Sequence, residues 1–109
     1  MRLVDLEAEF MKNLDEKSMT AVPTLAEADG IMFICPKCFV EKGGPVGAHR
    51  VLCWFVGRVP DDRDPKPGRW QPSGTGLDDL TFVGPAAASV LLSGPGCGWH
   101  GFVRNGDAT

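Results

Sequence analysis

Two pairs of metal-ligating side chains, each with two residues between its members, constrain the fold of this chain more than any other feature. The first pair is Cys35 and Cys38, and the second is Cys97 and His100. This spacing lets both side chains of a pair face one ion, and three cysteines with one histidine form a common tetrahedral zinc site. We therefore predict a structural zinc ion bound by Cys35, Cys38, Cys97 and His100. Gly98 gives the second turn the freedom that such a tight loop needs.

The long segment between the two pairs has consequences for folding. Residues 39–96 separate them, so the chain must return beside its start. A metal that closes so long a loop restricts the unfolded chain substantially. A chain of 109 residues fits one domain with a modest core, and a metal cross-link adds stability that packing alone does not supply. We expect a single zinc-stabilised domain spanning residues 1–109.

Disulfides and redox catalysis are the other common uses of cysteine pairs. Acidic residues near the N-terminus stand where the apolar segment of a signal peptide would be, so we expect a cytoplasmic protein with reduced thiols. A thioredoxin-like pair opens a helix directly after a strand. Because Pro36 lies between Cys35 and Cys38 and a turn-rich segment follows, we favour metal binding over redox chemistry.

His49 and Cys53 are further candidate ligands. Residues four apart on a strand lie roughly 13 Å from each other, so these two cannot both bind one ion. Cys53 alternates with apolar residues, which predicts a buried, apolar cysteine. His49 follows a glycine-rich turn, and we favour a role other than ligand for it. A surface position, a place beside the ligands and a role as a substitute ligand all remain open.

Two helices are expected before the first cysteine pair. Apolar residues recur every three or four positions at the start of the chain, which predicts an N-terminal helical segment within residues 1–20 with one buried stripe. Thr24 and Glu27 have the spacing of a capping box, and Gly30 can end a helix in the left-handed conformation. A short second helix is therefore expected between Thr24 and Gly30.

Short runs of branched and aromatic residues predict the strands of a small sheet. They occupy residues 31–34, 49–56, 80–83, 89–93 and 101–104. With the helices they give an α+β fold, in which a small, mostly antiparallel sheet is held by zinc-ribbon-like knuckles. Residues 57–76 show no periodicity and are expected to form a long loop.

The charge of the chain bears on its partners. The net charge of −3 argues against a general nucleic-acid binder, whose affinity comes from neutralising phosphates. No apolar run is long enough to span a membrane, and another protein is the expected partner. Two alternatives stay open: nucleic-acid binding through the Arg58–Arg69 loop, and a partner-binding surface that includes Trp70, Arg69 and His49. A simpler alternative is that Trp70 covers the core.

Catalytic motifs do not accompany the ligand pairs. Four protein ligands leave no open position on zinc for a water molecule. The sequence has no zinc-deaminase signature, HExxH helix, P-loop or nucleophile elbow. We therefore favour a non-enzymatic binding or assembly module. A zinc-dependent enzyme, in which His49 lies near an open metal site, is the alternative.

Several motifs together resemble a family of small proteins encoded in bacterial phages and prophages. They are residues 33–38 (FICPKC), His49 at the start of a strand, residues 67–70 (PGRW), residues 96–102 (GCGWHGF) and residues 105–106 (NG). The resemblance spans residues 24–106. It implies a zinc-bearing α+β domain of phage origin in a bacterial host, with Cys35, Cys38, Cys97 and His100 at the family's Cys/His positions. It implies no particular activity, and relatives also carry a histidine at the position of His49.

Overall fold

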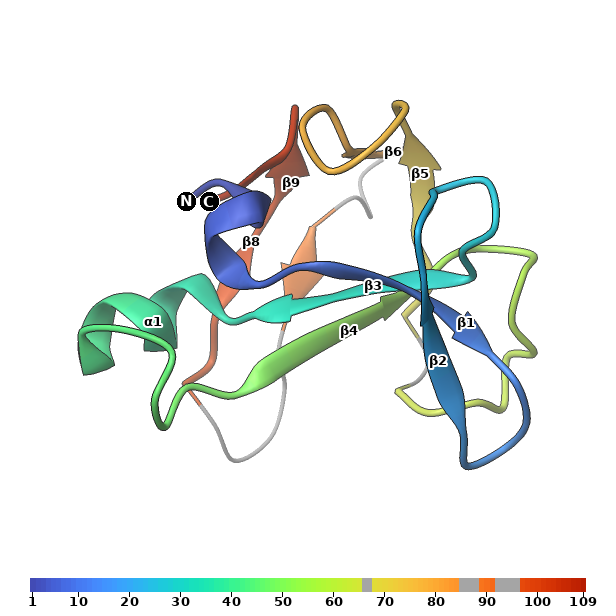
Figure 1. Cartoon of the computed structure of the whole chain (residues 1–109), viewed down its shortest axis with the longest axis horizontal. Helices are drawn as coiled ribbons and strands as arrows, with labels where there is room; N and C mark the ends of the chain where they lie inside the picture. Colours follow the sequence, from blue (N-terminus) through green and yellow to red (C-terminus); the bar gives the residue numbers. More distant parts are fainter. Residues whose placement is uncertain (66–67, 85–88, 92–96) are drawn as a thin grey trace.

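Strands make up most of the regular structure. A computed structural model describes residues 1–65, 68–84, 89–91 and 97–109. In chain order, the described elements are the 3₁₀ turn η1 (Leu3–Leu6), β1 (Glu9–Asn13), β2 (Met19–Val22), β3 (Gly30–Ile34), α1 (Pro36–Lys42), β4 (Arg50–Trp54), β5 (Gln71–Ser73), β6 (Thr81–Val83), β7 (Val90–Leu91), β8 (His100–Gly101), β9 (Val103–Arg104) and β10 (Asp107–Ala108). Figure 1 shows α1 extending from the end of the sheet formed by the first four strands.

The main sheet is antiparallel, with the strand order β2-β1-β3-β4. Its central strand β3 pairs with both β1 and β4, so that Ile31 faces Phe10 on one side and Cys53 on the other. Four of the five β3 residues are buried, which explains why the strand reads as a continuous apolar run in the sequence. The strands predicted at residues 31–34 and 49–56 are confirmed in β3 and β4.

The later strands form three short antiparallel pairs: β5 with β6, β7 with β8, and β9 with β10. The strand predicted at residues 80–83 is β6, and the one predicted at 101–104 falls on β8 and β9. Of the strand predicted at 89–93, residues 90–91 form β7, and residues 92–93 lie outside the described part. The expected long loop is shorter than residues 57–76, because β5 lies inside that range and pairs with β6, which follows it.

The two ends of the chain lie side by side, as Figure 1 shows. The N-terminal amine donates to the Ala108 carbonyl at 2.7 Å, and the Ala108 amide donates to the Met1 carbonyl at 2.8 Å. The Leu3 amide donates to the Gly106 carbonyl at 2.9 Å. These contacts fix β9 and β10 against the first turn and thereby anchor the segment that follows Cys97.

The predicted N-terminal helix is wrong. Within residues 1–20, all of which the structure describes, the regular elements are η1, β1 and the first part of β2. The spacing of Leu3 and Leu6 does bury both side chains in a 3₁₀ turn, but Glu7 adopts a left-handed φ of 51° and ends it. Backbone pairing with β3 then overrides the helix propensity of the following residues, because propensity is only a weak determinant of structure, and Leu14 is left 57% exposed.

The predicted second helix is also absent from its segment. The Glu27 amide donates to Thr24 Oγ1 at 3.3 Å, which is one half of the expected capping box. The Ala28 amide donates to the Leu25 carbonyl at 3.1 Å, and the turn ends there because the next residues enter β3. A short turn thus replaces the helix, and Leu25 and Ala28 still reach the core.

Close packing at the start of β3 gives a testable consequence. A Cβ placed on Gly30 would lie 2.6 Å from both the Cys53 carbonyl oxygen and Trp54 Cε3. We expect Gly30→Ala to lower the free energy of unfolding by about 1–3 kcal/mol, the usual cost of overpacking. Urea unfolding would measure it.

Gly76→Ala is the matched control, because a Cβ there meets nothing within 4 Å. Its free energy of unfolding should stay within about 0.5 kcal/mol of the wild type. Equal effects of the two substitutions would contradict this account of the β3–β4 packing.

Candidate metal centre

Four potential metal ligands, Cys35, Cys38, His49 and Cys97, lie close together in the structure. The first three come from one compact unit of β3, α1 and β4. Cys35 follows β3 directly and stands at the N-terminal end of α1, and Cys38 lies in the first turn of that helix. The chain then returns through a turn to His49, whose carbonyl accepts from the Cys35 amide at 2.9 Å. This hydrogen bond extends the β3–β4 pairing by one step and places His49 beside the first cysteine.

Cys97 joins this unit from a distant part of the chain. Its Sγ lies 3.3 Å from Cys35 Sγ and 3.2 Å from His49 Nε2. Lys37 Nζ donates to the Cys97 carbonyl at 2.7 Å. Two residues later Trp99 is 6% exposed and packs edge-on against Phe33 with ring centroids 6.0 Å apart. These contacts fix Cys97 and the residues that follow it.

The four donor atoms fit a tetrahedral metal site. Sγ of Cys35, Cys38 and Cys97 and a ring nitrogen of His49 all lie within 4.8 Å of one another. A zinc ion with ordinary bond lengths would hold such donors about 3.5–3.8 Å apart, so only small movements are needed. Three thiols and one imidazole are also a donor set that zinc prefers. Among the residues described, no Asp or Glu belongs to this group.

The structure brings three of the four predicted ligands together, and the fourth place is taken by His49 instead of His100. Trp99 is buried, and neighbouring residues of an extended chain point to opposite sides. His100 therefore points outward from β8, where it is exposed, and its ring lies 6.3 Å from that of Phe102. The expected second turn is replaced by a left-handed Gly98, at φ 68°, that leads into a strand.

His49 is the residue that the sequence-based choice missed. Cys53, the other candidate ligand, is fully buried in β4 and lies outside the group. The missing signal was the position of His49 at the start of β4, the strand paired with β3. In an antiparallel pair, the residue entering the second strand lies opposite the end of the first, and Cys35 is at that end.

The argument against a redox pair also requires correction. Cys35 and Cys38 do open a helix directly after a strand, as a thioredoxin-like pair would. Burial supplies a different reason to favour metal binding. Cys35 is 0% exposed, and burial raises the pKa of its thiol to about 12, although hydrogen bonds from the backbone of Cys38 and Lys37 act to lower it. A redox-active attacking thiol is instead accessible and has a lowered pKa.

Cys97 has the opposite electrostatic character. Desolvation raises the pKa of its thiol, but hydrogen bonds, first from His49 and then from Cys35, outweigh this effect and lower the pKa to about 6. This lowered pKa favours the thiolate form of Cys97 at neutral pH. A metal ligand must be deprotonated, so one sulfur of the group is already in the form that binds an ion.

The residues proposed for partner binding are largely engaged inside the chain. Trp70 stacks on Phe82 with centroids 5.8 Å apart, and its Nε1 donates to the Ser89 carbonyl at 3.1 Å. This is the arrangement expected if the ring covers the core. The Arg69 guanidinium donates to four carbonyls of its own loop, those of Pro60, Arg63, Pro65 and Gly68.

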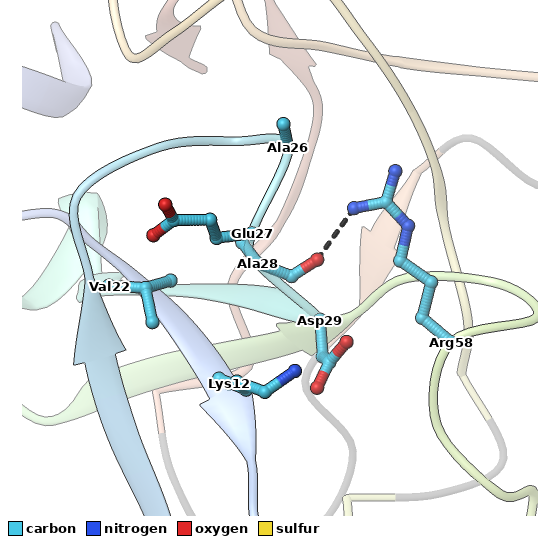
Figure 2. A pocket seen from close by; sticks show the side chains of 7 residues that line it. All are labelled: Lys12, Val22, Ala26, Glu27, Ala28, Asp29 and Arg58. Carbon is cyan, nitrogen blue, oxygen red and sulfur yellow. Dashed lines mark hydrogen bonds between the residues drawn. The ribbon is translucent and has the colours of Figure 1, made fainter.

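A separate open hollow of about 420 Å³ lies beside the turn before β3. Figure 2 shows Arg58 reaching across it, and Arg58 Nη1 donates to the Ala28 carbonyl at 2.6 Å. The same nitrogen donates to the Leu25 carbonyl at 3.2 Å. Lys12 and Asp29 also line the hollow. Arg58 thus stabilises the turn that replaces the predicted second helix.

A lysine beside the group offers a test of how the site is supported. Because Lys37 contacts the Cys97 carbonyl, Lys37→Ala should loosen this ligand and weaken zinc binding by about 10-fold, the lower end of the usual range for groups outside the ligands. Competition with a chromophoric chelator would measure the affinity. Lys42→Ala, on the same helix, should leave it unchanged, and equal losses from both would contradict a specific role for Lys37.

No protein-family model, curated protein or solved structure matches the chain. The one α-helix of the described residues is far too short to cross a membrane.

Proposed function

We propose that the chain is a structural zinc protein that acts as a non-enzymatic binding or assembly module. The observation that carries this proposal is the convergence of Cys35, Cys38, His49 and Cys97 within 4.8 Å. The ion would join the β3–α1–β4 unit to the segment that leads into β8. Its role is then to hold distant parts of the chain together.

The composition of the group supports a structural role over a catalytic one. Four protein donors fill the coordination sphere of tetrahedral zinc, whereas catalytic zinc keeps one position for water or substrate. His49, which was considered as a neighbour of an open site, belongs to the closed set instead. No carboxylate among the described residues stands with the group to act as a general base.

The proposed biological setting rests on the sequence resemblance. We place the protein in the bacterial cytoplasm, encoded by a phage or prophage, with another protein of phage or host as its partner. A reducing compartment suits this proposal, because metal-binding cysteines there stay free of disulfides. Genes for capsid or tail proteins beside this one would support an assembly role, and a metabolic gene cluster would oppose it.

Metal analysis of the purified protein tests the proposal directly. Protein prepared without chelators should contain one zinc ion per chain by elemental mass spectrometry. Cobalt substitution should give the intense visible absorption of a tetrahedral thiolate site. A protein that folds with no stoichiometric metal, and acquires none when zinc is added, would refute the proposed function.

A further inference from the structure

The cysteines of the metal group differ in their exposure to solvent. Cys35 is 0% and Cys38 is 6% exposed, whereas Cys97 is only half-buried. His49, whose Nε2 lies 3.2 Å from Cys97 Sγ, is exposed. The susceptibility of cysteine sulfur to oxidants follows its thiolate character and its exposure. A small oxidant arriving from solvent therefore meets Cys97 before the other two sulfurs.

The thiol of Cys35 lies beside the exposed thiol of Cys97. Cys35 Sγ is 3.3 Å from Cys97 Sγ, and a disulfide of about 2.0 Å requires the two sulfurs to move together by only about 1.3 Å. The remaining cysteine of the chain, Cys53, is 0% exposed and outside the group. The pair of sulfurs thus has the arrangement of an oxidised and a resolving cysteine.

We propose that Cys97 is an oxidation site for hydrogen peroxide and that Cys35 resolves it as a disulfide, which expels the metal. This inference rests on the proposed zinc-binding function and adds a means of regulating it. Two of the four ligands are consumed, and Cys38 and His49 alone do not complete a tetrahedral site. The ion that joins the β3–α1–β4 unit to the segment after Cys97 is then lost.

The chemistry proceeds in two balanced steps. The Cys97 thiolate attacks one oxygen of hydrogen peroxide, the O–O bond breaks, and Cys97 sulfenic acid and hydroxide form. Cys35, which is deprotonated because it is bound to the metal, then attacks the Cys97 sulfur as a thiolate, the S–O bond breaks, and a disulfide and a second hydroxide form. The two thiolates lose two electrons in total, which reduce peroxide to two hydroxides. These hydroxides take up two protons to give two water molecules.

The test uses the full-length, zinc-loaded protein treated with hydrogen peroxide. Released zinc is followed with a chromophoric chelator, and disulfides are mapped by mass spectrometry after proteolysis without reduction. We expect one zinc ion to be released for each Cys35–Cys97 disulfide formed. Reduction with a thiol and addition of zinc should restore the starting state. A limiting amount of N-ethylmaleimide should label Cys97 before Cys35 and Cys38.

Cys53→Ala is the matched control, because it removes the cysteine outside the group. It should release zinc and form the same disulfide as the wild type. Zinc that stays bound after peroxide treatment, release with a different disulfide, or first labelling of Cys35 or Cys38 would overturn this inference alone. A protein that carries no stoichiometric zinc before treatment would overturn both the inference and the proposed function.

Discussion

Cys35→Ser should abolish stoichiometric zinc binding. It should also leave the protein unfolded at 25 °C, so that no cooperative thermal unfolding is seen. Cys35 connects β3 with α1 and contributes one of the three sulfurs of the group. Structural zinc is worth about 10–16 kcal/mol in zinc-finger peptides, and the stability of a whole domain is only about 5–15 kcal/mol. Loss of the ion therefore removes most of the stability. Zinc analysis, together with thermal unfolding followed by circular dichroism, would measure both effects.

The control for this substitution is Cys53→Ala. Cys53 is as buried as Cys35 but lies outside the group, so the variant should keep its zinc and lose only about 1 kcal/mol of stability. The comparison separates the loss of a ligand from the loss of a buried sulfur. If Cys35→Ser kept one zinc ion per chain and the wild-type melting temperature, the proposed centre would not exist.

His49→Ala should weaken zinc binding by more than about 100-fold, whereas His100→Ala should leave the affinity within about twofold of the wild type. The loss for His49 exceeds the 10–100-fold range typical of groups outside the ligands, because its Nε2 lies 3.2 Å from Cys97 Sγ, inside the group. His100 points outward from β8 and is exposed. Chelator competition would give both affinities.

Rescue by a second metal-binding side chain adds a check on the geometry. His49→Cys converts the set to four cysteines, another common structural zinc set, and should recover much of the affinity that His49→Ala loses. If His100→Ala weakened binding more than His49→Ala, the ligand set predicted from sequence spacing would replace the one proposed from the fold.

Sequence patterns predicted the central strands better than the first segment of the chain. The apolar run of β3 and the branched residues of β4 are buried where they pair, so their pattern and their environment agree. The first twenty residues carry apolar spacing that suits a helix. That spacing is weak evidence, because Leu3 and Leu6 satisfy it within one turn and Phe10 and Met11 are then buried next to each other in β1. Pairing across the sheet decided the structure there.

The candidate site shows what the spacing of ligands along the sequence does not predict. The rule that two residues separate a pair of ligands predicted that Cys35 and Cys38 face one ion. In the structure Cys35 stands at the N-terminal end of α1, Cys38 lies in its first turn, and both belong to the group. The same rule chose His100 as the partner of Cys97. This rule does not predict that Trp99 is buried against Phe33 and that His100 therefore points outward. The role of His49 depends on the β3–β4 register, which no local motif contains.

X-ray absorption at the zinc edge tests the central claim most directly, because it reports the identity and distance of the atoms bound to the ion. The account predicts three sulfur atoms at about 2.3 Å and one nitrogen at about 2.0 Å, and this pattern should lose its nitrogen contribution in His49→Ala and keep it in His100→Ala. A wild-type spectrum with fewer than three sulfurs, or with the nitrogen lost in His100→Ala, would contradict a closed centre of Cys35, Cys38, His49 and Cys97.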